Sequence, residues 1–481
     1  MPQRSHRVIA VIVLATLALA SIAALERPHT TTTSIEPERI ARVFARHDNP
    51  DTPGCAAGVI VDGEPAFSGY YGAANLDYGI PLGSESRLMV GSLAKQFTAA
   101  AVILLAQRDR IALNEDVRSY LPELPDLAAR SGYNRPITVE NLLHHTSGIR
   151  DLIHLLHIEG RGLDPETDTE RITQMLHRQQ GLNFEPGARY NYSNTGYIIL
   201  AALVKRVTGM SLREFSEREL FEPSGMHSTH VHDDPTLVVP NRSMSYLPLS
   251  LLGETHRRSG AERFGEFYRN HVSWIGARGV FTTLDDLARW ERNYYDNRTP
   301  IRNFAQEMTR VGRSNAGGRI SYAGGLFVGS YKGLATVGHD GNYMGFRSHY
   351  QRFPDHNTAI AVLCNSAGID PTRKMRRVAD IVFEGRFERE LAEFAGVYRD
   401  PDYQTRYEVS VQHGRLRMRG PRSVSTELEW RGGARFSWED RRVRFERDAG
   451  GEYNRMTVTT NAAGTRTLER ESSSPNRPAE Q

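Results

Sequence analysis

The chain contains very little lysine: only four of its 60 lysine and arginine side chains are lysines. One of them, Lys95, follows Ser92 by three residues, and the others have no serine at that spacing: Lys205, Lys332 and Lys374. Arginine keeps its proton in proteins, whereas a lysine withdrawn from water can lose it and act as a base. Because Ser-x-x-Lys places a hydroxyl and an amine on one helical face, the pair is a candidate nucleophile and base. A surface lysine on a helix is the alternative interpretation.

Several other signals of catalysis are missing. The sequence has no glycine-rich phosphate-binding loop, no Gly-x-Ser-x-Gly motif and no convincing Ser-His-Asp order, which argues against nucleotide chemistry and against an α/β-hydrolase site. His144 and His145 are adjacent instead of four residues apart, and no glutamate-rich segment accompanies them. Zinc sites need three or four ligands at defined spacings. We therefore expect neither a metal site nor a cofactor.

The charge balance does not favour a nucleic-acid partner. The formal net charge is +3, and Arg4 and Arg7 contribute two of these charges from an N-terminal segment without acids. Nucleic-acid-binding domains carry a strongly basic face or run, and none is apparent. Hydrophobic residues at 39% and charged residues at 24% are typical of a soluble globular protein. The expected partner is a small-molecule or peptide substrate, and the sequence leaves the oligomeric state open.

The first 25 residues have the pattern of an export signal. A basic start with Arg4, His6 and Arg7 precedes an almost purely apolar run at residues 8–25, which includes small residues suited to cleavage. The run is also long enough to remain as a membrane tether. Both alternatives predict an exported protein, periplasmic or extracellular, and residues 1–25 are either a signal peptide or an anchor.

Strand signals at both ends of residues 34–386 suggest one domain with a shared sheet. An apolar hairpin is expected at residues 55–71, with Asp62-Gly63 as its turn. Later strand patterns lie at 334–337, 347–353 and 358–364. Between them the chain is mainly helical and includes a strongly apolar helix at residues 92–108. The predicted fold class is α/β (α+β): an antiparallel sheet flanked by helices, with a helical region inserted.

The character of the sequence changes after about residue 388. Short alternating strands separated by turns such as His413-Gly414 and Gly450-Gly451 predict a small antiparallel β-barrel, lipocalin-like, at residues 388–470. The remaining residues, 471–481, form a polar tail that we expect to be disordered.

Two further motifs accompany Ser92 and Lys95. Tyr190-Asn191-Tyr192-Ser193-Asn194 contains Tyr-x-Asn, and His339-Asp340-Gly341 contains His-x-Gly. Alone, Tyr192 would be assigned to the core and His339 to a structural role. In this order, the three motifs resemble the serine β-lactamase-like superfamily, in the branch of class C β-lactamases, D-alanyl-D-alanine carboxypeptidases, D-aminopeptidases and related esterases. The resemblance extends from about Pro37 to Phe383 and implies a β-lactamase/transpeptidase-like sheet.

The resemblance implies a role for each residue of the acyl-transfer machinery. Ser92 would be the nucleophile, and Lys95 its base, kept neutral by desolvation and by a neighbouring positive charge or dipole. Tyr192 would share the proton and pass it to the leaving group. Asn194 would bond Lys95 and the substrate amide. The backbone N–H groups of Ser92 and Asn342 would form the oxyanion hole.

Two other residues of the third motif concern the substrate. Gly341 would let the substrate lie against the strand as an added edge. His339 stands where penicillin-directed branches have lysine. A histidine near its reference pKa of about 6.5 is mostly neutral above pH 7, so we expect weak recognition of β-lactams and carboxylates, improving towards pH 6.

These inferences predict an exported serine hydrolase that forms an acyl-enzyme on Ser92 and cleaves amides, peptides or esters. A promiscuous carboxylesterase is one alternative. A non-catalytic penicillin-recognition or cell-wall-binding protein is another, although the chain has every acyl-transfer residue.

The last prediction concerns the two cysteines. In the antiparallel sheet that the resemblance implies, Cys55 at the start of the first strand lies opposite Cys364 at the end of the last. Export would place them in an oxidising compartment. A disulfide and two buried thiols both remain open.

Overall fold

The computed structural model describes residues 35–158, 169–252, 263–266, 274–421, 425–462 and 464–471. The predicted signal peptide or anchor, residues 1–25, and the tail beyond Glu471 lie outside the described residues. Among the described helices, none is by itself long and apolar enough to cross a membrane; α7 and the helical segment after it pass that test only as a pair bent by 78°.

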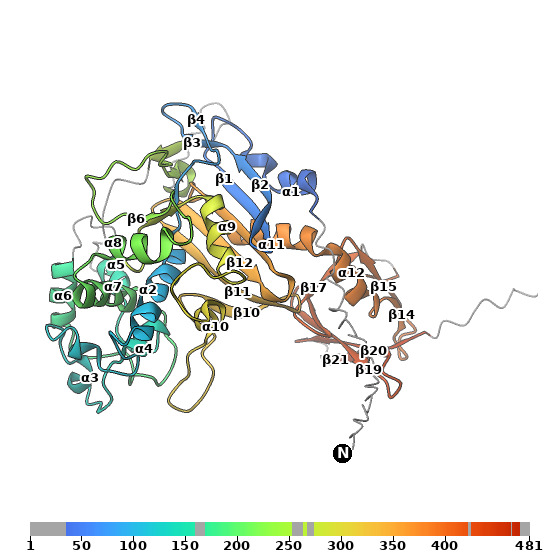
Figure 1. Ribbon diagram of the computed structural model, residues 1–481. Helices are drawn as coiled ribbons and strands as arrows, with labels where there is room; N and C mark the ends of the chain where they lie inside the picture. Colours follow the sequence, from blue (N-terminus) through green and yellow to red (C-terminus); the bar gives the residue numbers. More distant parts are fainter. Residues whose placement is uncertain are drawn as a thin grey trace, which may run out of the picture. The chain divides into compact units, whose positions relative to one another are not determined.

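One antiparallel sheet carries strands from both ends of the α/β domain, as the sequence predicts. Its six strands lie in the order β10 (Phe327–Tyr331), β11 (Leu334–Tyr343), β12 (Phe346–Phe353), β13 (Thr358–Cys364), β1 (Cys55–Val61) and β2 (Glu64–Tyr71). Figure 1 shows the blue strands β1 and β2 beside the orange and yellow strands from late in the chain. Asp62 and Gly63 form the predicted turn, both with positive φ, because a two-residue hairpin needs left-handed backbone there.

Helices cover both faces of this sheet. On one face α1 (Pro37–Phe44) and α11 (Pro371–Val382) pack against the strands, and Ala57, Val59 and Val362 point into that layer. On the other face α9 (Leu284–Arg292) packs on β1 and β2, and alternate residues such as Ala56 and Ile60 join a second core. The period-2 alternation explains why nearly every residue of β1 is buried.

The inserted region packs around a helix that is buried along nearly its whole length, α2 (Lys95–Gln107). The sequence predicts that helix from Ser92, but the structure has a 3₁₀ turn at Gly91–Ala94 and α helix only from Lys95. The other helices here are α3 (Leu127–Arg130), α4 (Val139–Leu143), α5 (Leu152–Ile158), α6 (Thr169–Arg178), α7 (Asn194–Thr208), α8 (Leu212–Ser216) and α10 (Phe304–Thr309). Short strands form two further pairs and one three-stranded sheet. The pairs are β3 (Ala73–Asn75) with β4 (Ile80–Pro81) and β7 (Tyr246–Pro248) with β8 (Phe264–Glu266), and the small sheet has the order β5 (Leu88–Met89), β9 (Val280–Thr282) and β6 (His230–Val231).

A disulfide joins the two cysteines. Cys55 and Cys364 are direct partners in the β1–β13 register, and their sulfur atoms are bonded. Of the two possibilities that the sequence leaves open, the structure has the disulfide. It ties the first strand of the domain to the last strand of the sheet, across 309 residues of sequence.

The C-terminal strands close into an eight-stranded antiparallel barrel. They are β14 (Gly396–Arg399), β15 (Arg406–Gln412), β16 (Arg415–Arg419), β17 (Thr426–Trp430), β18 (Arg435–Trp438), β19 (Arg441–Arg447), β20 (Tyr453–Thr460) and β21 (Gly464–Arg470). Inward-facing apolar side chains such as Leu416, Phe445 and Met456 are buried. Helix α12 (Glu384–Ala392) adds Phe387 and Leu391 to the same cluster.

Candidate active site

Ser92 lies in the 3₁₀ turn that links β5 to α2, and it is half-buried. The preceding residue, Gly91, has φ +55°, a left-handed value that favours glycine. A Cβ on Gly91 would lie 2.6 Å from the backbone nitrogen of Asn342 in β11. Glycine therefore lets the turn that carries Ser92 pack directly on the strand that carries the third motif.

Lys95 is fully buried and its ammonium group lies among three oxygen atoms. Its Nζ is 3.2 Å from Ser92 Oγ, 2.9 Å from Asn194 Oδ1 and 2.9 Å from the carbonyl oxygen of Ala277. The structure thus brings together Ser92, Lys95 and Asn194, as the motifs predict, and adds a carbonyl from the segment before β9.

Burial lowers the pKa of Lys95 well below its usual value, and the positive charge of Arg278 lowers it further. The negative charges of Asp151 and Asp340 oppose this shift. Desolvation is the larger cause because the ammonium loses nearly all its contact with water. A neutral amine at 3.2 Å from Ser92 Oγ can accept the proton of the hydroxyl.

The resemblance implies a positive charge or a dipole beside Lys95, and in the structure Arg278 supplies the positive charge. Its guanidinium lies between two aromatic rings, 3.9 Å from the centroid of Trp274 and 4.3 Å from that of Tyr343, an arrangement that stabilises a cation. Burial lowers its own pKa to about 10, so it remains charged at neutral pH. The only signal in the sequence was its place directly before the matching stretch that begins at Gly279.

Asp151 is a second residue that the motifs do not reveal. Its Oδ2 accepts hydrogen bonds from the backbone N–H of Asn194 at 2.9 Å and from the Asn194 side-chain amide at 2.8 Å. Because the Nδ2–H of Asn194 donates to Asp151, the Oδ1 of Asn194 is oriented towards Lys95. Asp151 thereby fixes the orientation of the amide at the start of α7.

Tyr192 is a buried phenol next to the dyad. Its ring centroid is 4.9 Å from Lys95 Nζ, and burial raises the pKa of its hydroxyl. Ser92 is near enough to oppose that rise, although the two hydroxyl groups do not have the geometry of a hydrogen bond. Its place beside both Ser92 and Lys95 fits a proton-transfer role.

His339 faces the site from β11 and is 3% exposed. Burial is the main cause that lowers its pKa to about 4; a charge on Lys95 acts in the same direction, and Asp340 opposes the shift. The sequence-based expectation of a pKa near 6.5 is therefore wrong, because it neglected burial. Protonation of His339 does not begin near pH 6. The side chain of Asp340 is 61% exposed, and its Oδ1 lies 3.9 Å from His339 Nδ1.

The edge of β11 beside Ser92 has no strand partner within the described residues. β10 pairs with β11 only over Leu334–Gly338, so the backbone from His339 to Tyr343 lacks a strand on that side. The Asn342 nitrogen approaches Gly91 there, as an oxyanion site shared with Ser92 requires. The structure gives a reason for glycine at position 341 that the motif did not suggest: a Cβ there would collide with the carbonyl oxygen of Val90.

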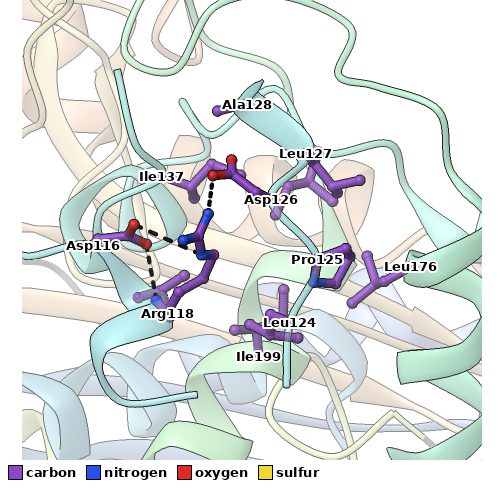
Figure 2. A pocket seen from close by; sticks show the side chains of 12 residues that line it. Asp116, Arg118, Leu124, Pro125, Asp126, Leu127, Ala128, Ile137, Leu176 and Ile199 are labelled. Carbon is purple, nitrogen blue, oxygen red and sulfur yellow. Dashed lines mark hydrogen bonds and ion pairs between the residues drawn. The ribbon is translucent and has the colours of Figure 1, made fainter. Parts of the chain in front are cut away.

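Two cavities differ in their relation to the site. One of about 330 Å³ lies against this part of the sheet and is lined by Asp340, Asn342, Arg347 and residues 367–372, near the start of α11. The cavity in Figure 2 is different: it measures about 20 Å³, is lined mainly by apolar side chains such as Leu124, Ile137 and Leu176, and has Arg118 between Asp116 and Asp126 at its side. It has room for about one water and is a packing void rather than a substrate site.

The metal interpretation finds no support in the part of the chain that the structure describes, where no three His, Cys, Asp or Glu side chains gather as a cation site. His144 Nδ1 is 3.0 Å from the carbonyl oxygen of Tyr322, and His145 Nδ1 accepts from the backbone N–H of Ser193 at 3.2 Å. Both histidines thus hold loops beside the cleft.

Comparison with known proteins agrees with this geometry. The Beta-lactamase family model matches residues 40–383. A D-aminopeptidase of Cereibacter sphaeroides is 26% identical over 315 residues, which are 65% of this chain and 57% of that protein. A D-aminopeptidase of Brucella anthropi is 26% identical over 391 residues, 78% of this chain and 69% of that protein. This chain thus spans between about half and two thirds of the length of these relatives.

A solved structure extends the likeness to the fold. The octameric penicillin-binding protein homologue from Pyrococcus abyssi aligns with a TM-score of 0.58 and 22% identity, covering 90% of this chain and 98% of its own. The chain belongs to the Beta-lactamase family.

Proposed function

We propose that this member of the Beta-lactamase family is an exported amidase or peptidase that forms an acyl-enzyme on Ser92. The observation that carries the proposal is the buried Lys95, whose Nζ lies 3.2 Å from Ser92 Oγ and is held by Asn194 and Ala277. A neutral lysine in this position would take the serine proton as Ser92 attacks a carbonyl carbon. Tyr192 would then supply a proton to the departing amine.

The substrate would lie along the open edge of β11, with its carbonyl oxygen near the backbone nitrogens of Ser92 and Asn342. Relatives named D-aminopeptidase make amides or peptides of D-amino acids the first class to test. The neutral, buried His339 supports neutral substrates over those that need a cation for a carboxylate. That same observation favours the second candidate, a carboxylesterase.

A panel of D-amino-acid amides, neutral acyl esters and a chromogenic cephalosporin distinguishes these activities. The wild-type protein should turn over at least one amide or ester, and Ser92→Ala should abolish both turnover and labelling by serine-reactive probes. Lys95→Arg should lose at least about a hundredfold in kcat, since arginine keeps the charge but cannot act as the base. A folded Lys95→Arg protein with most of its activity would contradict the dyad. A wild-type protein that binds penicillin without any turnover would favour the non-catalytic alternative.

Export is part of the proposal, and the Cys55–Cys364 disulfide supports it, because such bonds persist in oxidising compartments. Cell fractionation of the full chain, with and without residues 1–25, tests this point. The full chain should be found outside the cytoplasm, free if the segment is cleaved and in the membrane fraction if it remains. A protein that stays in the cytosol with residues 1–25 intact would be evidence against it.

A further inference from the structure

His145 lies directly behind Tyr192, although neither the motifs nor the proposed mechanism uses it. It is 1% exposed, and its ring centroid lies 4.3 Å from that of Tyr192 and 4.5 Å from that of Tyr322. It has φ +55°, a left-handed value that is uncommon outside glycine, although histidine adopts it more often than most other residues. The turn after α4 therefore holds this imidazole in a costly backbone conformation against the catalytic phenol.

A backbone contact determines which nitrogen of His145 carries the proton. The N–H of Ser193, one residue after Tyr192, donates to His145 Nδ1 at 3.2 Å. A neutral imidazole that accepts at Nδ1 has its proton on Nε2. Burial keeps the ring neutral, and its titratable neighbours disfavour its protonation further whenever they are charged: Lys95 on α2, His339 on β11 and the adjacent His144. His145 is thus a fixed Nε2–H donor.

The Nε2–H of His145 has no acceptor among the described residues. His145 Nε2 is buried and makes no hydrogen bond with any part of the chain that the structure describes, and the same holds for the hydroxyls of Tyr192 and Tyr322. Buried donors are seldom left unpaired, so each case calls for an explanation. The Tyr197 hydroxyl, also nearby, already donates to the carbonyl oxygen of Leu143 at 2.9 Å. Among the surrounding oxygens, that of Tyr192 is the one that changes charge during the reaction.

We propose that His145 is a positioning residue whose Nε2–H donates to the phenolic oxygen of Tyr192 while Tyr192 gives its proton to the leaving group. The inference rests on the proposed acyl transfer. In that step the Tyr192 O–H bond breaks as an N–H bond forms on the departing amine and the C–N bond breaks. The phenolic oxygen then regains a proton from Lys95, which received it from Ser92. A preorganised donor stabilises the negative charge that the oxygen carries in between.

This role makes a prediction that a packing role does not. An amine is a poor leaving group and must be protonated as it departs, whereas p-nitrophenolate leaves without a proton. His145 should therefore matter for acylation by amides and much less for acylation by p-nitrophenyl esters with the same acyl group. A histidine that only packs the site would affect both substrates alike.

The test is His145→Asn, assayed on an alkyl amide and a p-nitrophenyl ester of one D-amino acid. Asparagine tolerates the left-handed backbone and can still accept from Ser193 N–H, but it lacks the distal donor. We expect kcat/KM for the amide to fall at least about tenfold more than that for the ester. His145→Gln, which can place an N–H near the position of Nε2, should recover part of the amide-to-ester ratio.

His144→Asn is the matched control, since His144 is also buried beside Tyr322 but bonds a backbone carbonyl instead. Its amide-to-ester ratio should equal that of the wild type. Equal losses on both substrates in folded His145→Asn, or a ratio within about threefold of the wild type, would overturn the proposal. Turnover that persists in Ser92→Ala would instead overturn the acyl-enzyme itself, so the two failures are distinguishable.

Discussion

At the scale of single residues, the proposed reaction at Ser92 depends on how Lys95 is kept neutral. Burial is the main cause of its lowered pKa, and the charge of Arg278 is the second. Arg278→Met removes that charge, so the pKa of Lys95 should rise. Since the reaction needs neutral Lys95, the acid limb of the pH profile of kcat/KM should move to higher pH, with activity at pH 7 falling and returning in alkali.

Arg278→Lys is the control for this prediction, because it keeps a cation between Trp274 and Tyr343. Its acid limb should stay near that of the wild type, even if the stacking is poorer. An unshifted limb in Arg278→Met would show that Arg278 does not influence the base.

His339 provides the second residue-scale prediction. With its pKa lowered to about 4, it is neutral throughout the range from pH 6 to 8. The ratio of kcat/KM for a cephalosporin to that for a neutral ester should therefore be low and constant across this range. His339→Lys should raise the ratio by roughly tenfold, as a charge-assisted hydrogen bond to the substrate carboxylate allows. A wild-type ratio that rises steeply between pH 8 and 6 would contradict the burial of the imidazole.

At the scale of elements, the disulfide between β1 and β13 should stabilise the sheet. It closes a sequence separation of 309 residues, so its removal restores much entropy to the unfolded chain. We expect Cys55→Ser with Cys364→Ala to lower the free energy of unfolding by roughly 2–4 kcal/mol. Denaturant unfolding of the variant and of the wild type, each with and without reductant, measures this loss.

Reductant should lower the stability of the wild type by a similar amount and leave the variant unchanged. A wild type with two titratable thiols after unfolding without reductant would show that the bond does not form. Because Ser92 does not contact either cysteine, the folded variant should keep its activity.

At the scale of the whole molecule, the change of sequence character after about residue 388 predicts a barrel that can be removed. The structure makes this removal costly, because Phe387 and Leu391 of α12 join barrel residues in one buried cluster with α1 and α11. A chain ending at residue 386 should still label at Ser92, since none of the described contacts of Ser92 or Lys95 comes from the barrel. Its thermal midpoint should be several degrees lower, because apolar surface becomes exposed.

A chain ending at residue 395, which retains α12, is the comparison for that truncation. It keeps the contact between Phe383 and Phe387, whose ring centroids are 6.3 Å apart. It should unfold at a higher temperature than the shorter chain unless exposed Leu391 and Phe394 cause association. A soluble truncated chain that does not react with serine-directed probes would show that the barrel completes the cleft.

The sequence by itself determined the elements whose signals are local. Alternation and the Asp62-Gly63 turn predict the hairpin of β1 and β2, and apolar runs predict β12 and β13. The individual barrel strands have weak local signals, because most of them have a single buried residue, as with Leu428 in β17 and Leu468 in β21. Strands that close a small barrel can be mostly polar outside, so their pattern is weak.

The motifs likewise predicted the groups to which the proposed reaction assigns roles: Ser92, Lys95, Tyr192 and Asn194. Only the tertiary structure decided the environment that lowers the pKa of Lys95 and orients Asn194. Arg278 and Asp151 come from segments far from Lys95 in sequence, and their effects depend on distance and on exclusion of water, which no local pattern records. The same reason explains why the pKa of His339 could not be predicted. The sequence shows that the residue is a histidine, but its lowered pKa results from burial by other parts of the chain.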